Sequence, residues 1–247
     1  MHALSGQEIL RIWEVGLGQH PLDRALTMLE MAFPEYSQDE LTEFSIGQRD
    51  AHLLAIRERT FGSRLVSMAE CPACRERLEF VLNANELYVG PGTGIEDVEQ
   101  KVHVMTIDDY ELHFRLPNSL DLAAIAGCRD VAAARSLLVR CCVLQALQDG
   151  AEVAVESLPE IVTGALAARM AEYDPQAEMG LELTCLACDY SWRAILDIVV
   201  FLWAEICAQA KRLLGEVHTL ARAYGWREAD ILSMTAARRQ FYLEMVS

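Results

Sequence analysis

The sequence has few basic residues for its length and no long apolar run. Among 247 residues it carries 21 Lys and Arg against 37 Asp and Glu, which gives a net charge of −16. A surface that binds duplex nucleic acid needs clustered Lys and Arg to displace counterions from phosphate. We therefore expect no nucleic-acid partner. The acidity is interpreted first as a source of solubility, and the alternative is a docking face for a basic protein.

The N-terminus also lacks the pattern of an export signal. MHALSGQEILRIWEVG has no basic stretch followed by an apolar run, and the longest apolar run, Ile198 to Ala204, is far shorter than the ~20 residues that a membrane span requires. We expect neither a cleavable signal nor membrane insertion, and we expect the protein to be assembled in the cytoplasm. In that reducing compartment the eight cysteines should stay free or bind metal rather than form disulfides.

Signatures of the common enzyme classes are missing from the sequence. It contains no G-x-S-x-G, no H-E-x-x-H, no P-loop and no dinucleotide fingerprint. GPGTG, within the turn-rich stretch Val89 to Gly94, lacks the lysine and the strand-to-helix setting of a phosphate cradle. No spacing of carboxylates pairs them as acid and base. We predict a protein that is not an enzyme and has no small-molecule substrate.

The pattern of apolar residues predicts an α+β chain. With 52% hydrophobic residues, it is long enough to bury a real core. We expect helices to dominate the first seventy residues, with a capping box at Ser5 and Glu8 and a helix beginning at Pro21. A third helix should run from about Gln48 to Phe61 and end at Gly62.

The middle of the chain mixes both periodicities. Alternation predicts strands in ERLEFVLN (76–83), KVHVMTI (101–107) and YELHFRLP (110–117), the last two joined by an Asp108-Asp109 turn. Helices are predicted over Ser119–Gln148, with an interruption near Gly127, and over Leu158–Tyr173. MGLELTCLACDYSWRAIL then reads as strand, hook and strand.

The C-terminal part is strongly helical. Asp197 can cap a long amphipathic run that continues to Tyr224 and ends at Gly225, and two short helices, about 228–233 and 236–245, follow it. We predict three segments: an N-terminal helical segment (1–64), a small antiparallel zinc-ribbon-like sheet with inserted strands and helices (65–196, insertion about 84–174), and a C-terminal helical segment (197–247).

Two cysteine hooks of the form C-x-x-C are the most specific motif. They are Cys71/Cys74 in CPAC and Cys185/Cys188 in CLAC. Each C-x-x-C turn presents two thiolates to one metal, and two turns complete the tetrahedron that structural zinc prefers. The usual interval between such hooks is ~15–20 residues, whereas here it is 110 residues. The zinc-ribbon hypothesis therefore requires the chain from Asn83 to about Asp174 to be an insertion whose ends return to one sheet.

Other interpretations of the hooks remain. They could be two unrelated pairs, or CPAC could be a thioredoxin-like redox pair. The redox motif needs a strand before it and a helix after it, but the sequence predicts a strand after CPAC. Four thiolates would also close the coordination shell against catalysis.

The remaining candidate residues have simpler explanations. Cys128, Cys141, Cys142 and Cys207 have apolar helical neighbours and are interpreted as small buried hydrophobes. The histidines considered as ligands are more often satisfied groups than ligands; they are His103, His113 and His218. Five aromatic residues are candidates for partner contacts, with core packing as the more frequent role; they are Trp13, Trp203, Trp226, Phe241 and Tyr242.

Nearly the whole chain resembles a known family. The resemblance is carried by IWEVGLGQHPLDRALTML, by RDAHLLAIRERTFGSRL before CPAC, and most specifically by DIVVFLWAEICAQAKRLLGEVHTLARAYGWREADILSMTAARRQFYLEMV. These stretches are similar to proteins encoded in contractile-tail gene clusters of phages, prophages and contractile injection systems, commonly labelled baseplate hub assembly chaperones. Members of the group commonly carry cysteine pairs where this chain has Cys71/Cys74 and Cys185/Cys188.

The resemblance implies an assembly or structural component of a contractile tail that works through contacts with other tail or baseplate proteins, and that can be incorporated in the tail particle. Together with the hooks it leads to a first hypothesis, a zinc-stabilised, non-enzymatic baseplate protein with Zn²⁺ as a structural cofactor. A dithiol oxidoreductase using Cys71 and Cys74 is the second hypothesis. A zinc-ribbon adaptor for transcription or translation is the third, and the net charge of −16 disfavours it.

Overall fold

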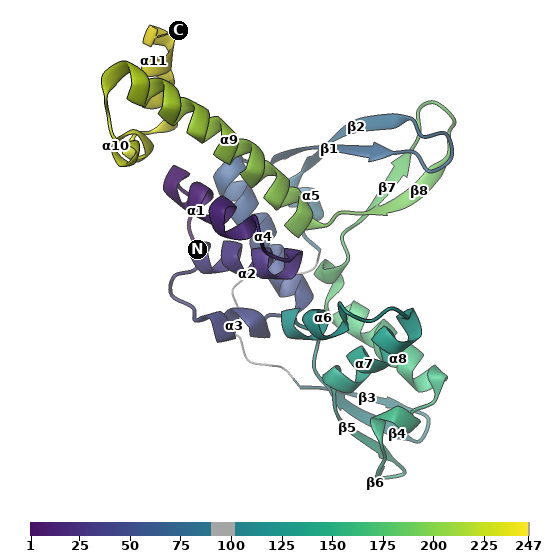
Figure 1. The fold of residues 1–247 in the computed structure, drawn as a ribbon. Helices are drawn as coiled ribbons and strands as arrows, with labels where there is room; N and C mark the ends of the chain where they lie inside the picture. Colours follow the sequence, from purple (N-terminus) through teal and green to yellow (C-terminus); the bar gives the residue numbers. More distant parts are fainter. Residues whose placement is uncertain (90–101, 247) are drawn as a thin grey trace. The chain divides into compact units, whose positions relative to one another are not determined.

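The protein was examined as a computed structural model, which describes residues 1–89 and 102–246 (Figure 1). The predicted turn VGPGTG, apart from Val89, and Lys101 at the start of a predicted strand lie outside the described residues. The chain divides into two compact units. Unit 1 comprises Met1–Glu35, Leu53–Gly62 and Asp197–Ser247, and unit 2 comprises Tyr36–His52 and Ser63–Leu196. The division into three segments drawn from the sequence stays a prediction.

Unit 1 is helical, and its helix ends lie where the capping signals predict them. Its helices are α1 (Gly6–Gly16), α2 (Pro21–Ala32), the C-terminal part of α4 (Ile46–Phe61), α9 (Ile198–Tyr224), α10 (Glu228–Ser233) and α11 (Ala236–Val246). Ser5 and Glu8 form the expected capping box. Asp197 accepts a hydrogen bond from the Val200 N–H at the start of α9, and Gly225 ends it with φ 68°.

Close packing of α1 on α9 holds unit 1 together. A Cβ atom added to Gly16 would lie 2.5 Å from the Trp203 ring, so a larger residue there would force the helices apart. The Arg24 guanidinium lies 4.4 Å above the centroid of the same ring. The Arg57 guanidinium, 2% exposed, donates to both carboxylate oxygens of Glu205 at 2.8 and 2.7 Å. The buried cation is therefore paired within the unit.

Unit 2 contains all the strands of the described residues, together with short helices. Its elements along the chain are α3 (Gln38–Glu43), the first turns of α4, β1 (Arg64–Glu70), β2 (Arg77–Asn83), α5 (Ala84–Leu87), β3 (His103–Ile107), β4 (Tyr110–Phe114), α6 (Ser119–Ile125), α7 (Val131–Cys142), β5 (Val143–Gln148), β6 (Ala151–Glu152), η1 (Val155–Ser157), α8 (Glu160–Tyr173), η2 (Pro175–Ala177), β7 (Gly180–Thr184) and β8 (Ser191–Ile195). Together with the long helix α9, these elements confirm the α+β class and the small antiparallel sheets.

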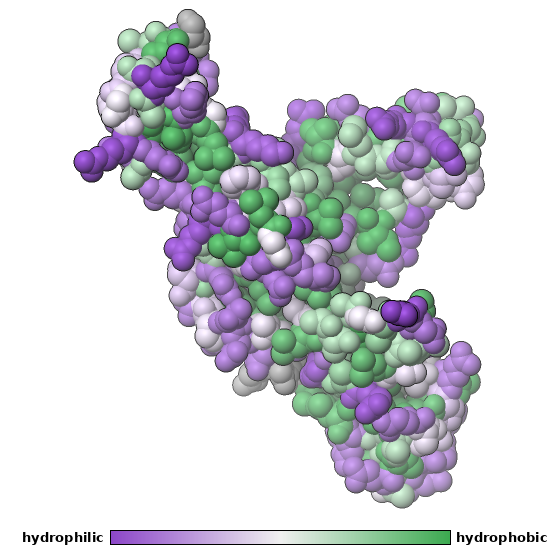
Figure 2. All heavy atoms as spheres, viewed as in Figure 1, coloured by the Kyte–Doolittle hydropathy of each residue, from purple (hydrophilic) through white to green (hydrophobic). Residues whose placement is uncertain are grey.

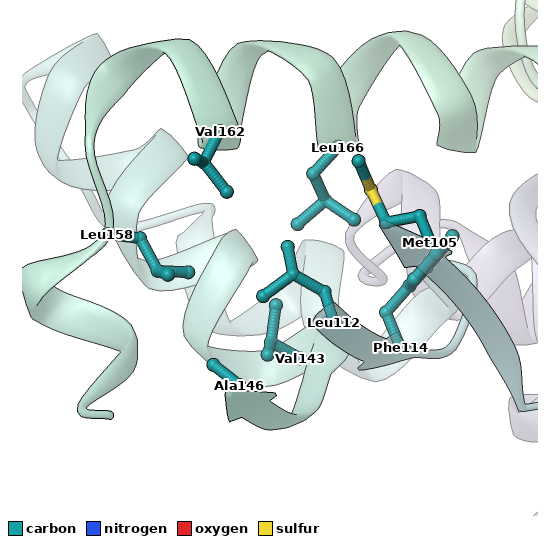
Figure 3. Packing of buried hydrophobic residues seen from close by; sticks show 8 residues of the cluster. All are labelled: Met105, Leu112, Phe114, Val143, Ala146, Leu158, Val162 and Leu166. Atoms are coloured by element: carbon teal, nitrogen blue, oxygen red, sulfur yellow. The ribbon is translucent and has the colours of Figure 1, made fainter. Parts of the chain in front are cut away.

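A four-stranded antiparallel sheet in the order β3-β4-β5-β6 carries the main hydrophobic core of unit 2. Helix α8 packs on this sheet, and Leu166 and Val162 of the helix point toward Leu112 of β4 (Figure 3). The buried cluster as a whole comprises Met105, Leu112, Phe114, Val143, Ala146, Leu158, Val162 and Leu166. The tight turn between β3 and β4 uses Asp108 at φ 51°, as the sequence predicts.

Two sequence predictions in this region are wrong. The predicted helix Ser119–Gln148 ends at Cys142, and Val143–Gln148 is strand β5. Val143 and Ala146 are both buried although they are three residues apart, because a bulge in the pairing with β4 shifts the register between His113 and Phe114. That bulge gives the strand the spacing of a helix, which misled the sequence interpretation.

The prediction that the first seventy residues are helical is also wrong at its end, since Arg64–Glu70 is strand β1. In β1 Leu65 and Ser67 are buried and the residues between them are exposed, which is the period of a strand. Helix α3 was missed as well, although Ser37 and Glu40 form a capping box that the sequence displays.

The two ends of the predicted insertion lie next to each other. The Gln176 side chain accepts a hydrogen bond from the Val89 N–H at 2.7 Å and donates one to the Leu87 carbonyl at 3.0 Å. Just before it, Asp174 accepts the Gly47 N–H at 2.9 Å, and a Cβ on Gly47 would lie only 1.9 Å from that carboxylate. Contrary to expectation, the hairpins β1–β2 and β7–β8 form two separate sheets rather than one.

No helix in the described part of the chain has both the length and the hydropathy to cross a membrane.

The core of unit 2 can be tested by shortening one buried side chain of α8. Leu166→Ala should lower the free energy of unfolding by about 2–5 kcal/mol, because it removes buried apolar area and leaves a cavity. Ile161→Ala on the same helix, where the side chain is 68% exposed, should change it by less than about 0.5 kcal/mol. Urea denaturation followed by circular dichroism measures both, and equal losses would contradict the packing shown in Figure 3.

Candidate metal site

The four hook cysteines meet at the ends of two hairpins. Cys71 and Cys74 lie in the loop between β1 and β2, and Cys185 and Cys188 lie in the loop between β7 and β8, where the free ends of the hairpins come together (Figure 1). The Sγ atoms of Cys71 and Cys188 are 3.7 Å apart, and those of Cys74 and Cys185 are 3.6 Å apart. All four sulfurs lie within 4.8 Å of one another. The structure thus brings together every residue that the sequence predicts as a ligand.

Both hooks have the same backbone conformation. In the first, the Cys71 N–H donates to the Glu76 carbonyl at 2.9 Å and the Arg75 N–H donates to the Cys71 carbonyl at 2.8 Å. In the second, the Cys185 N–H donates to Tyr190 and the Asp189 N–H donates to Cys185, both at 2.9 Å. The residue after each second cysteine is left-handed, with φ 62° at Arg75 and 55° at Asp189. The two loops are therefore local structural repeats of one turn.

The spacing of the sulfurs fits one tetrahedral metal ion. A Zn–S bond is ~2.3 Å, so two sulfurs of a zinc tetrahedron are separated by roughly 3.8 Å. The two short separations of 3.6 and 3.7 Å are close to that value, and they are far longer than the ~2.05 Å of a disulfide bond. Cys71 and Cys185 are buried, while Cys74 and Cys188 are exposed. This arrangement suits a soft, thiophilic cation bound at the surface end of the hairpins.

The electrostatics of the four thiols also call for a cation. Burial raises the pKa of Cys71, but the backbone N–H groups of Cys74 and Ala73, together with neighbouring thiols, outweigh it and lower that pKa to about 7. The Glu76 N–H favours the Cys74 thiolate, yet the adjacent thiols and burial raise its pKa to about 12. The first thiolate is thus favoured and a second beside it is disfavoured, because like charges repel. A divalent cation removes that repulsion and allows all four thiols to ionise.

The hairpins themselves offer little else to hold them. In β1–β2 the register pairs Leu65 with Leu82, and in β7–β8 it pairs Leu183 with Trp192. The inward-facing residues of β2, β7 and β8 are only half-buried; they are Leu78, Phe80, Leu82, Leu181, Leu183, Trp192 and Ala194. Isolated two-stranded hairpins are marginally stable in water. A bond between their tips would therefore contribute a large share of their stability.

The histidines and other cysteines are not brought to this site. His103 stacks on Tyr173 with ring centroids 4.5 Å apart, and His113 contacts Glu111 at 2.9 Å. These two histidines are not cross-strand partners, because His103 pairs with Phe114 in the register. Among the described residues the one group of cysteines, histidines and carboxylates close enough to hold a metal is the hook quartet.

The aromatic candidates fall into two places in unit 1. Trp203 packs on α1 and Arg24, whereas Trp226 and Tyr242 form a cluster with Tyr224 in which the Tyr224 and Trp226 rings stack at 4.4 Å. Phe241 alone of the five is largely exposed, at 62%. Packing therefore accounts for most of these residues, as the more frequent role predicts.

Arg75 and Asp189 were missed as structural parts of the site. Each adopts the left-handed conformation that lets the chain turn back from the second cysteine into the next strand. Asp is one of the residues that tolerate this conformation, so Asp189 gave a weak signal, whereas Arg75 gave none.

Fold and site together define a class, an α+β protein whose two hairpins meet at a four-cysteine cluster able to hold a metal ion. A family model described as T4 bacteriophage base plate protein matches residues 26–203, more than half of the chain, and the chain belongs to that family. It is a phage baseplate protein by family, and the matched region contains both hooks. Comparison with curated proteins and with solved structures gave no match.

The left-handed turn can be tested at Arg75. Arg75→Val should destabilise the first hook by about 1–2 kcal/mol, because a β-branched residue is strained at positive φ. Arg77→Val makes the same chemical change in extended strand β2, where valine is favoured, and should change stability by less than about 0.5 kcal/mol. Thermal unfolding of the purified protein measures the difference, and equal effects would contradict the assigned turn.

Proposed function

We propose that the protein is a zinc-stabilised, non-enzymatic structural or assembly protein of a contractile-tail baseplate. The observation that carries the metal part is the convergence of four cysteine sulfurs within 4.8 Å. Family membership supports the baseplate part and suggests that its partners are other tail proteins.

The ligand set favours zinc as the ion. Four thiolates in a tetrahedron select zinc or iron among common metals, and zinc needs no redox chemistry to serve as a structural bond. Cys71, Cys74, Cys185 and Cys188 would hold it. Bound zinc would supply a closed, inert crosslink, and the protein residues would supply the two matched turns that aim the thiolates.

A crosslink at this position has a specific mechanical effect. The segment between Cys74 and Cys185 contains the sheet β3-β4-β5-β6 and its helices. Joining the hooks would close a loop of 110 residues, whose entropy in the unfolded chain would otherwise oppose the pairing of the hairpins. The proposed role of the metal is therefore to keep the hairpins rigid while the protein contacts its neighbours.

A redox role for CPAC is less well supported. Strand β1 precedes Cys71, but strand β2 follows Cys74 where a thioredoxin-like motif needs a helix whose dipole activates the thiol. The second hook lies against the first and would have no task in such an enzyme. A closed four-thiolate shell would also leave no position for water or substrate.

Metal analysis of protein purified under reducing conditions tests the site. We expect one zinc per chain, and loss of zinc in Cys74→Ser because a tetrahedral site with one ligand removed binds far less tightly. Cys128→Ser is the matched control, because Cys128 lies outside the quartet and should retain the metal. Iron instead of zinc would correct the identity of the ion, and absence of any stoichiometric metal from the wild type would contradict the site.

The baseplate role is tested in the particle. A producer strain lacking this gene should yield few complete contractile tails by electron microscopy, and the wild-type gene should restore them. Cys74→Ser should restore fewer than Cys128→Ser, because the hairpins would lose their crosslink. Mass spectrometry of purified particles separates a component that remains in the tail from an assembly chaperone that leaves. Normal tails without the gene would contradict the proposal.

A further inference from the structure

The most exposed large hydrophobic side chain of the described residues lies at the metal site. Leu186, in the second hook, is 94% exposed. We call the exposed residues of the two loops the hook tip: Pro72, Ala73, Arg75, Leu186, Ala187 and Asp189. Figure 2 shows hydrophobic and hydrophilic residues side by side at the free end of the hairpins. An apolar group fully exposed on a tight turn contributes nothing to the fold that the structure describes.

The hook tip is also rigid once the metal is bound, and in this respect the inference rests on the proposed function. Each loop is closed by two backbone hydrogen bonds, and the four sulfurs fix one loop against the other. A rigid surface loses little conformational entropy on binding, so even a small apolar contact can be productive.

The two loops carry opposite charges at equivalent positions. Arg75 follows Cys74 and Asp189 follows Cys188, with nearly the same backbone conformation. Both side chains are exposed, and neither forms an ion pair within the described part of the chain. The hook tip is thus an apolar centre with one cation on one side and one anion on the other.

From this pattern we propose that the hook tip binds the hook tip of a second copy of this chain, related to the first by a twofold axis. A twofold contact is self-complementary, so a residue i that meets residue j is matched by j meeting i. One orientation of the axis places Arg75 against the partner copy's Asp189 twice, with Leu186 and Ala187 between them. The perpendicular orientation would place like charges together, so the charges select the first.

Charge and size set the strength of this contact. The net charge of −16 makes unspecific association between copies unfavourable, so the contact depends on the local pairs. Two loops bury much less than the roughly 800 Å² per partner of a standard interface. The contact is therefore weak between isolated chains, and it gains strength where other contacts already hold two copies close together.

Sedimentation velocity of the full zinc-bound chain, over a range up to millimolar concentration, tests the contact. We expect reversible dimerisation that Leu186→Asp weakens at least about tenfold, because a charge replaces the apolar centre. Ile161→Asp makes the same change at another exposed apolar residue, on α8, and should leave dimerisation unchanged. A chain that stays monomeric at every concentration, or a dimer indifferent to Leu186→Asp, overturns the proposal.

Charge reversal gives a sharper test. Arg75→Asp and Asp189→Arg should each weaken self-association, since each places like charges across the axis. An equimolar mixture of these two variants should associate again, because one copy then carries two anions and the other two cations. Both positions accept an Arg or an Asp backbone in this chain, so folding should be preserved. Failure of the mixture to associate overturns the twofold arrangement.

Zinc content is measured in every sample of these experiments. Monomeric protein with one zinc per chain would refute the contact and leave the metal site intact. Protein without zinc would refute the proposed function itself, before the contact is considered.

Discussion

The convergence of two cysteine hooks is the constraint on which the arrangement of unit 2 depends. Four sulfurs from residues separated by 110 positions lie within 4.8 Å, and the hairpins that carry them pair with no third strand. Two-stranded hairpins have too little buried surface to be stable alone. Their inward-facing residues are only half-buried, so coordination at the tips is the strongest bond available to them.

The rest of unit 2 is held by ordinary packing. The sheet β3-β4-β5-β6 and helix α8 enclose their own apolar cluster, and the chain returns through hydrogen bonds between Gln176 and the backbone near Leu87. This combination of a self-contained inserted core and a metal-binding clasp gives the hooks a reason to be so far apart in the sequence. It also agrees with a protein of the baseplate family, in which contacts with other tail proteins are the expected activity.

Much of the fold was predictable because its signals are local. The cap at Ser5, the left-handed Gly225 and the turn at Asp108 depend on a few neighbouring residues, and the structure has each where it was predicted. Strand β5 was not predictable in the same way. Its buried residues Val143 and Ala146 have a helical spacing that arises from a bulge against β4, and the bulge is a property of the pairing rather than of the segment.

The sequence by itself determined the identity and pairing of the candidate ligands, because a C-x-x-C turn is a local structure and two such turns complete a tetrahedron. It also determined the helix ends and the acidic charge. Only the tertiary structure decided that the hooks meet, that their hairpins stay separate sheets, and that Leu186, Arg75 and Asp189 share one exposed tip. Such proximity depends on how the intervening 110 residues fold back, and no local pattern encodes that distance.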